Sequence, residues 1–248
     1  GTPVANTDPL QLGNDQNYGG RFFDGQLDEL RIYTSALSAS QISALVSERH
    51  SCALSLQCFN DSFSQASLSS DWAVTTSGGS FGLPVIVANR LRLTNSAGNV
   101  ATAATLQRLF PAASNYVQVQ FRHYAYGGSG ADGIAVVLSD AAVTPQPGAD
   151  GGPLGYGTKG GSNVGFAGGW LGVGIDEFGN FSTEGSVPAT GPGRRPDSVA
   201  IRGSGSGNSG YRYIAGTNTP ALNPGIDVSG ATPGPGFLYR ITVDGRDS

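Results

Sequence analysis

One apolar, glycine-rich stretch runs directly into an acidic loop in this chain: residues 165–180, with the sequence GFAGGWLGVGIDEFGN. Its first part carries no charge and has small residues at many positions, so it predicts a strand buried on both faces. Glycine lowers β propensity, and so many glycines in one strand indicate close backbone approach or curvature. The loop that follows, with Asp176, Glu177, Phe178 and Asn180, offers oxygen ligands that suit a hard cation such as calcium. The alternative is a polar hairpin end without a metal, because Asp and Asn also favour turns.

The composition argues against several classes of partner. Charged residues make up 13% of the 248 residues and the net charge is -4. Without a basic run, this composition predicts no nucleic-acid partner. No apolar run reaches the ~18 residues of a membrane span, so we expect no membrane insertion. The chain contains no Met and begins at Gly1, and we therefore expect it to be a segment of a longer protein.

The two cysteines lie close together in the sequence. Cys52 and Cys58 have no cluster of His or Cys nearby that could complete a zinc site. A local disulfide is the expected use of the pair, and it points to an oxidising compartment outside the cytoplasm. Two free thiols are the alternative.

The clearest helix signal in the chain covers Ala39–Ser47. Ser38 is a good N-cap and Gln41 follows three residues later, which together form a capping box. Leu37 before the cap and Ile42 within the first turns are spaced for a hydrophobic staple. The sequence therefore predicts one short helix in a chain that otherwise has the pattern of β structure.

The run RFFDGQLDELRIYTSALSASQISAL, which contains this helix, resembles the end of laminin-G-like jelly-roll domains of the concanavalin-like type. The resemblance implies that residues 1–49 are the C-terminal part of such a domain. Residues 50–60 then form a linker pinned by the expected disulfide. Residues 61–248 form a second domain, and the fold class predicted for the chain is all-β.

Strands with alternating polarity dominate the second domain. In YVQVQFRHY, the residues Val117, Val119 and Phe121 share one face of a predicted strand, and polar residues share the other. His123 falls on the apolar face, where a core residue is expected rather than a catalyst. Long Gly/Ser/Pro-rich loops separate the strands, and such loops are often functional or mobile.

Three separate stretches carry polar groups suited to a binding site: SGADGIAVVLSD (129–140), GGPLGYG (151–157) and IDEFGN (175–180). In this order and spacing they resemble L-type lectins, the legume-lectin-like β-sandwiches. The resemblance covers residues 61–248 and implies a concanavalin-like jelly-roll sandwich that lacks the last strands of the family.

The resemblance also implies a sugar-binding role for four residues. Asp132, held by a cis peptide bond to Ala131, would accept hydrogen bonds from two sugar hydroxyls. Gly152 would donate its backbone N–H to the sugar. Asn180 would donate its side-chain N–H, and Phe178 would stack its ring on the apolar face of a pyranose.

A calcium site is implied beside the sugar. Its ligands would be the Asp176 carboxylate, the Phe178 carbonyl, the Asn180 side-chain oxygen and Glu184. Glu184 stands where the lectin pattern has Asp.

Two further positions depart from the lectin pattern. Gly174 and Ser198 replace the Glu and His that hold a transition metal in plant lectins, so we expect no transition metal here.

Hydrolysis of glycosides is the enzymatic alternative within this type of sandwich. Retaining hydrolases place two glutamates on one strand so that both face the same cleft about 5 Å apart. Here the positions flanking Asp176 are Gly174 and Phe178, and Glu177 points to the opposite face if the strand continues. The chain is therefore predicted to be no enzyme, with no catalytic residues.

The laminin-G-like tail, the Cys-pinned linker and the lectin-like run together resemble the MshQ-type surface proteins of mannose-sensitive haemagglutinin pilus systems. That resemblance implies an extracellular, bacterial cell-surface protein that binds glycans, and pilus or other surface subunits are its further expected partners. A structural or assembly subunit with a vestigial sugar site is the alternative, because open sheet edges invite pairing with another chain.

Overall fold

The computed structural model describes residues 35–47, 58–112, 114–217 and 220–246. The chain divides into two units, Gly1–Leu56 and Gln57–Ser248, and each is described by itself. The sequence LDELRIY, which alternates apolar and polar residues as a half-buried strand does, lies outside the described residues. Among the residues that are described, no helix is long and apolar enough to cross a membrane.

The predicted helix of the first unit is confirmed with its expected bounds as α1 (Ala39–Ser47). The capping box is also confirmed: the Ser38 N–H donates to Gln41 Oε1 at 2.8 Å, and the Gln41 N–H donates to Ser38 Oγ at 3.3 Å. Ile42 is 51% exposed, so the apolar stripe of the helix is not buried at this residue.

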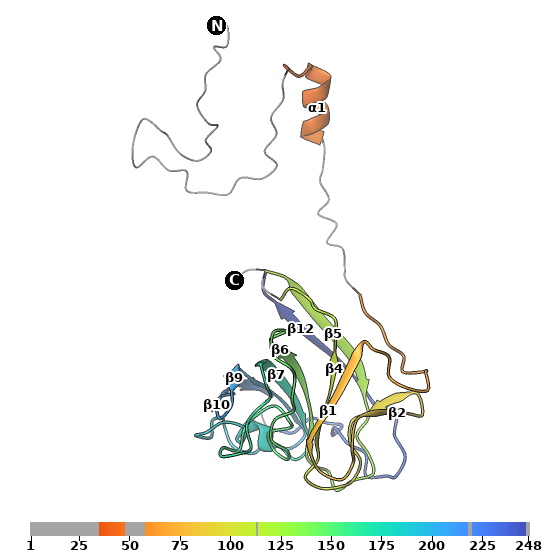
Figure 1. The fold of residues 1–248 in the computed structure, drawn as a ribbon, viewed down its shortest axis with the longest axis vertical. Helices are drawn as coiled ribbons and strands as arrows, with labels where there is room; N and C mark the ends of the chain where they lie inside the picture. The colour runs from red at the N-terminus through yellow and green to blue at the C-terminus, as the bar shows by residue number, and fades with distance from the viewer. Residues whose placement is uncertain (1–34, 48–57, 113, 218–219, 247–248) are drawn as a thin grey trace. The chain divides into compact units, whose positions relative to one another are not determined.

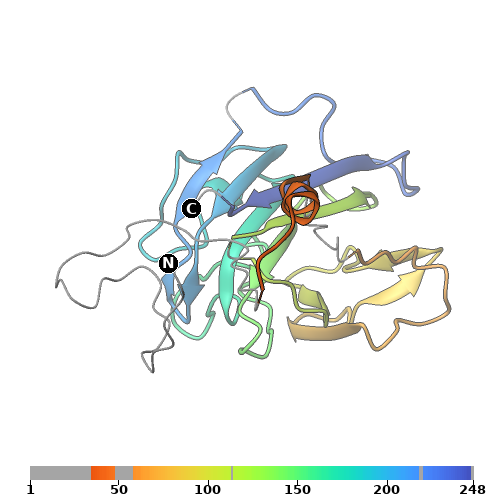
Figure 2. The same ribbon diagram turned by 90° about the horizontal axis from the view of Figure 1, so that it is seen from above.

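The second unit is built from antiparallel strands (Figures 1 and 2). Its largest sheet has the strand order β11–β8–β7–β6. The other sheets are the pairs β12–β5, β1–β4, β2–β3 and β10–β9. The strand bounds are β1 (Trp72–Gly78), β2 (Val85–Val87), β3 (Arg90–Arg92), β4 (Ala101–Leu106), β5 (Tyr116–His123), β6 (Gly133–Ser139), β7 (Gly169–Asp176), β8 (Ser198–Arg202), β9 (Gly205–Ser206), β10 (Ser209–Gly210), β11 (Tyr213–Gly216) and β12 (Phe237–Asp244). A short 3-10 turn, η1 (Asn180–Ser182), follows β7. The described chain is therefore all-β apart from α1 and this turn, as predicted.

Strand β7 lies in the middle of the largest sheet and is mostly buried, as the glycine-rich stretch predicts. It begins at Gly169 rather than at Gly165, because Phe166 closes a turn onto Gly169 with a backbone hydrogen bond of 3.1 Å. Its second residue, Trp170, is 49% exposed. The buried part of the strand therefore runs from Gly172 to Asp176.

One face of the largest sheet lies against the pair β12–β5. Apolar side chains from both sheets line a shared interior space: Val117, Val119, Val136, Leu138, Leu171, Val173, Ile241 and Val243. This arrangement is a β-sandwich, because two sheets contribute alternate residues to one apolar layer. The predicted alternation along β5 is confirmed, and His123 is buried at its end against the Tyr239 ring.

The opposite face of the same sheet is covered by loops. Three buried aromatic rings from separate parts of the chain form one cluster on this side, and each lies where a glycine leaves room. A β-carbon on any of these glycines would overlap the ring. Tyr156 lies on Gly172 and Phe181 on Gly174, both in β7, while Tyr211 lies on Gly205 in the neighbouring β9. The glycines thus allow the close approach that the sequence predicts, and the long loops supply the core instead of lying loosely over it.

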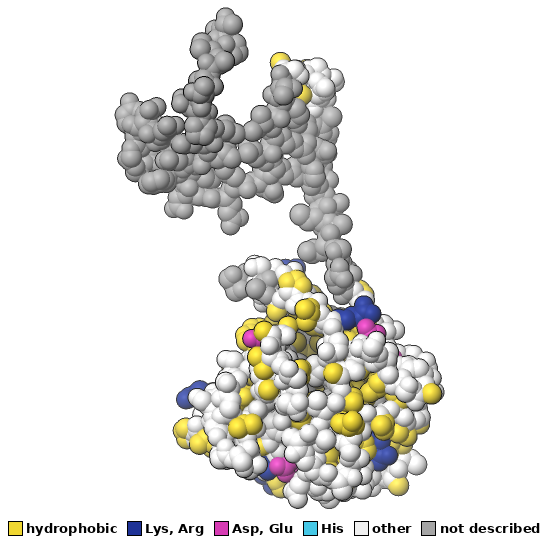
Figure 3. All heavy atoms as spheres, in the orientation of Figure 1, with side chains coloured by type: hydrophobic (Ala, Val, Ile, Leu, Met, Phe, Trp, Pro, Cys, Tyr) yellow, Lys and Arg dark blue, Asp and Glu magenta, His cyan; other side chains and the backbone are white. Residues whose placement is uncertain are grey.

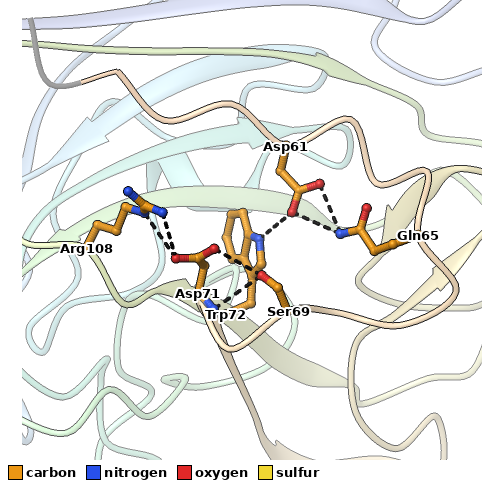
Figure 4. A network of polar contacts seen from close by, with 6 residues as sticks. All are labelled: Asp61, Gln65, Ser69, Asp71, Trp72 and Arg108. Atoms are coloured by element: carbon orange, nitrogen blue, oxygen red, sulfur yellow. Dashed lines mark hydrogen bonds and ion pairs between the residues drawn. The ribbon is translucent and has the colours of Figure 1, made fainter.

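A polar network anchors the segment that leads into β1 (Figure 4). Trp72 Nε1 donates to Asp61 at 2.9 Å, and Gln65 donates to the same carboxylate at 3.1 Å. Arg108, which follows β4, pairs with Asp71 at 3.1 Å. On the face of the molecule shown in Figure 3, charged side chains are sparse and scattered among apolar and neutral ones.

Candidate functional site

Asp132 stands immediately before β6, at the end of the sheet where β7 finishes. Its peptide bond to Ala131 is cis, as the lectin resemblance implies. Its backbone carbonyl accepts hydrogen bonds from the N–H groups of Glu177 at 2.9 Å and Phe178 at 3.3 Å. The Asp132 carboxylate has no hydrogen-bond partner among the described residues. The loop after β7 is therefore tied to the start of β6, with one acceptor group left for another molecule.

The Gly151–Gly152 loop brings the remaining predicted sugar-binding groups to the same place. A β-carbon at Gly151 would lie 3.7 Å from Asp132 Oδ2, and one at Gly152 would lie 2.6 Å from Asn180 Cβ. No described carbonyl accepts the Gly152 N–H. The structure thus brings Asp132, Gly152 and Asn180 together, and Phe178 joins them through its hydrogen bond to Asp132.

The Asp176 carboxylate is fully buried at the end of β7. One oxygen accepts the Gly179 N–H and the other accepts the Phe181 N–H, each at 2.7 Å. Burial raises the pKa of this carboxyl to about 6, although both N–H groups act to lower it. No described cation lies within ion-pair distance, so the two N–H groups are the closest partners of the buried charge, and Arg194 stabilises it from farther away.

Phe178 is held by an arginine that the sequence did not point to. Arg194 Nε donates to the Phe178 carbonyl at 2.9 Å, and its guanidinium lies 3.8 Å from the centre of the Phe178 ring. Phe178 as a whole is 37% exposed. One of its faces is therefore covered, and only the other is open to a pyranose.

Three of the four predicted calcium ligands fit a hard cation. The Asn180 side chain and the Glu184 carboxylate have no hydrogen-bond partner among the described residues, and a β-carbon at Gly152 would lie 2.5 Å from Glu184 Oε2. Each Asp176 oxygen accepts only one N–H and keeps a second lone pair. The Phe178 carbonyl does not fit, because it already contacts a guanidinium cation. Calcium itself stays a prediction, and Asp176, Asn180 and Glu184 are the residues that would hold it.

The two positions that depart from the lectin pattern are filled by other contacts. A β-carbon at Gly174 would overlap the Phe181 ring. Ser198 lies opposite Asp176 in the sheet register, and its hydroxyl donates to the Arg195 carbonyl. The expectation of no transition metal also stays a prediction.

Two charged residues near Asp132, Lys159 and Glu177, are not among the residues that the lectin resemblance assigns to the sugar or calcium site. Lys159 Nζ lies 3.5 Å from Asp150 Oδ1 and 3.1 Å from where a Gly151 β-carbon would be. Burial, and after it the charge of neighbouring carboxylates including Asp227, raises the pKa of Glu177 to about 7. Lys159 is the single lysine of the chain, which is the signal that sequence reading could have used.

Arg202, in the last position of β8, was also missed. Its guanidinium is fully buried, and burial lowers its pKa to about 10. Nε donates to the Phe181 carbonyl at 2.8 Å and Nη1 donates to the Tyr211 carbonyl at 2.7 Å. Nη2 donates to the Thr190 carbonyl at 3.3 Å. Arg202 therefore connects the loop that carries Asn180 to the sheet and to a second loop.

Cys58 is exposed and has no disulfide partner among the described residues. Cys52 lies outside them, so the pairing stays a prediction.

The fold defines the class of protein: the second unit is an all-β sandwich of antiparallel sheets. A family model described as the Concanavalin A-like lectin/glucanases superfamily matches residues 1–43. No curated protein matches the chain. The match supports the laminin-G-like, concanavalin-like prediction for the start of the chain. The narrower resemblances to L-type lectins and to MshQ-type proteins stay predictions.

Proposed function

We propose that residues 61–248 form a carbohydrate-binding module of an extracellular bacterial surface or pilus-associated adhesion protein, supported by calcium and without enzymatic activity. One observation carries the proposal. Asp132, the Gly152 N–H and the Asn180 amide come from three separate loops and converge, and no described residue makes a hydrogen bond to any of these groups. Acceptor and donor groups arranged in this way suit vicinal hydroxyls, each of which is both donor and acceptor.

Binding would use the groups that the protein leaves free. The Asp132 carboxylate accepts two hydroxyl hydrogens, while the Gly152 N–H and the Asn180 amide donate to hydroxyl oxygens. Burial raises the pKa of Asp132, the nearby Lys159 lowers it, and Asp150 raises it. Calcium, when bound, would fix the loop that presents Asn180 and offset the buried charge of Asp176.

The test is a glycan array probed with the full chain, with and without a calcium chelator. Asp132→Asn should abolish binding, because an amide N–H2 group replaces an oxygen that must accept a hydrogen bond from a sugar hydroxyl. Asp140→Asn is the matched control, since Asp140 follows the other end of β6 and caps the N–H of Ala142 at 2.9 Å. An Asp132→Asn variant that binds like the wild type would refute the proposed role of Asp132.

Assembly is the second candidate function, favoured by the pair β12–β5. No described strand pairs with the outer edge of β12, and its inward residues remain half-buried. A free edge of this kind can accept a strand from another chain. Sedimentation of the full chain tests it: a monomer at all concentrations would count against strand exchange.

A further inference from the structure

We propose that Arg194 contacts the ligand at the rim of the Asp132 site and selects glycans that carry a negatively charged substituent, either a carboxylate or a sulfate ester. The inference rests on the proposed glycan-binding function and narrows it to acidic sugars. Its basis is that the guanidinium is already fixed in place while two of its nitrogens remain free.

The guanidinium is fixed on one face and one edge. Its face lies on the Phe178 ring at 3.8 Å, and its Nε edge donates to the Phe178 carbonyl at 2.9 Å. The backbone beside it is fixed as well, because the Arg195 N–H donates to the Gly179 carbonyl at 2.9 Å and the Asp197 N–H donates to the Glu177 carbonyl at 3.0 Å. A side chain ordered before binding loses less entropy when it captures a ligand.

The opposite edge of the same guanidinium has no partner in the described part of the chain. There, Nη1 and Nη2 make no hydrogen bond or ion pair. Two other arginines of this unit do use these nitrogens: Arg202 donates from both to backbone carbonyls, and Arg108 pairs with Asp71. A planar fork with two free N–H2 groups matches the oxygens of a carboxylate or a sulfate ester.

The charges around the site orient such a ligand. Asp132 places a carboxylate at the end where sugar hydroxyls would bind, with Asp150 and Lys159 close to it. Arg194 places positive charge next to Phe178, at the other end. A sugar should therefore direct its hydroxyls to Asp132 and its anionic substituent to Arg194.

The experiment measures binding of the full chain to neutral glycans, glycans with uronic or sialic acids, and sulfated glycans. For each acidic ligand that binds, its neutral counterpart is measured too: the methyl ester or amide of the acid, or the desulfated sugar. We expect the acidic form to bind at least tenfold more tightly. Arg194→Gln should remove this preference, with a loss of about ten- to hundredfold for the acidic form only.

Two further variants sharpen the result. Arg194→Lys keeps the charge but lacks the fork, so it should recover only part of the preference for carboxylates. Arg212→Gln removes an exposed arginine whose side chain makes no hydrogen bond with described residues, and it should bind within about twofold of the wild type. If Arg212→Gln lost as much affinity for the acidic glycan as Arg194→Gln, the preference would depend on the net charge of the protein alone, which would overturn the inference.

The outcomes separate the two proposals. Binding to neutral glycans with no preference for acidic ones, or a preference that survives Arg194→Gln, overturns the role of Arg194 and leaves the carbohydrate-binding function standing. Failure to bind any glycan overturns both. Comparing the carboxylated with the sulfated glycans shows which anion the Arg194 guanidinium binds.

Discussion

Replacing the buried Arg202 with lysine should destabilise the second unit strongly. The guanidinium reaches the Phe181 and Tyr211 carbonyls, at 2.8 and 2.7 Å, from two different nitrogens. A lysine ammonium carries its donors at one point and cannot satisfy both. A buried acceptor that loses its partner costs about 1–3 kcal/mol, and breaking a buried charged network costs about 3–5 kcal/mol. We therefore expect Arg202→Lys to lower the free energy of unfolding by about 3–5 kcal/mol.

Urea denaturation followed by tryptophan fluorescence measures this loss. Both tryptophans of the chain, Trp72 and Trp170, lie in the unit Gln57–Ser248 and report on it directly. The control is Arg122→Lys, because Arg122 is exposed and donates to the Pro235 and Gly236 carbonyls. It should change stability by no more than about 0.5 kcal/mol. An Arg202→Lys variant within about 1 kcal/mol of the wild type would refute the view that the guanidinium holds these loops.

Three further outcomes are expected. Gly152→Ala should abolish glycan binding on an array, because the new β-carbon would lie 2.5 Å from Glu184 Oε2 and 2.6 Å from Asn180 Cβ; unchanged binding would place the ligand elsewhere. Glu177→Gln should be more stable than the wild type by about 1–2 kcal/mol at pH 8 and equally stable below about pH 4.5. The reason is that the pKa of Glu177 in the folded state is raised to about 7, so the wild type loses stability as the pH rises through that value. Melting temperatures of the two proteins that change in parallel with pH would contradict this. Calcium should raise the melting temperature of the wild type less below pH 6, where protons compete for Asp176, and should have no effect on Asp176→Asn.

Local patterns in the sequence predicted the features that depend on neighbouring residues. The capping box of α1 and the alternation along β5 involve residues close in sequence, and both are confirmed. The lectin resemblance identified Asp132, Gly152 and Asn180, which the structure brings together.

The missed features depend on contacts between distant segments. Nothing near Arg202 in the sequence indicates that carbonyls of Phe181 and Tyr211 surround it. Arg194 lies sixteen residues from Phe178, in a stretch that reads only as a Gly/Pro-rich loop. The sequence also could not show that loop residues such as Tyr156 form the core, because a loop's composition says nothing about which face of a sheet it covers.

The rings that lie on glycines suggest how such a scaffold can change its specificity. Each of two site loops is attached to β7 by one ring, Tyr156 on Gly172 and Phe181 on Gly174. The other positions of each loop can vary in sequence without removing this attachment. The ring and its glycine must change in size together, however, so an alanine at Gly174 would require a smaller side chain at position 181. A library for new ligands should therefore randomise loop positions beside the rings and leave β7 and the ring–glycine pairs unchanged.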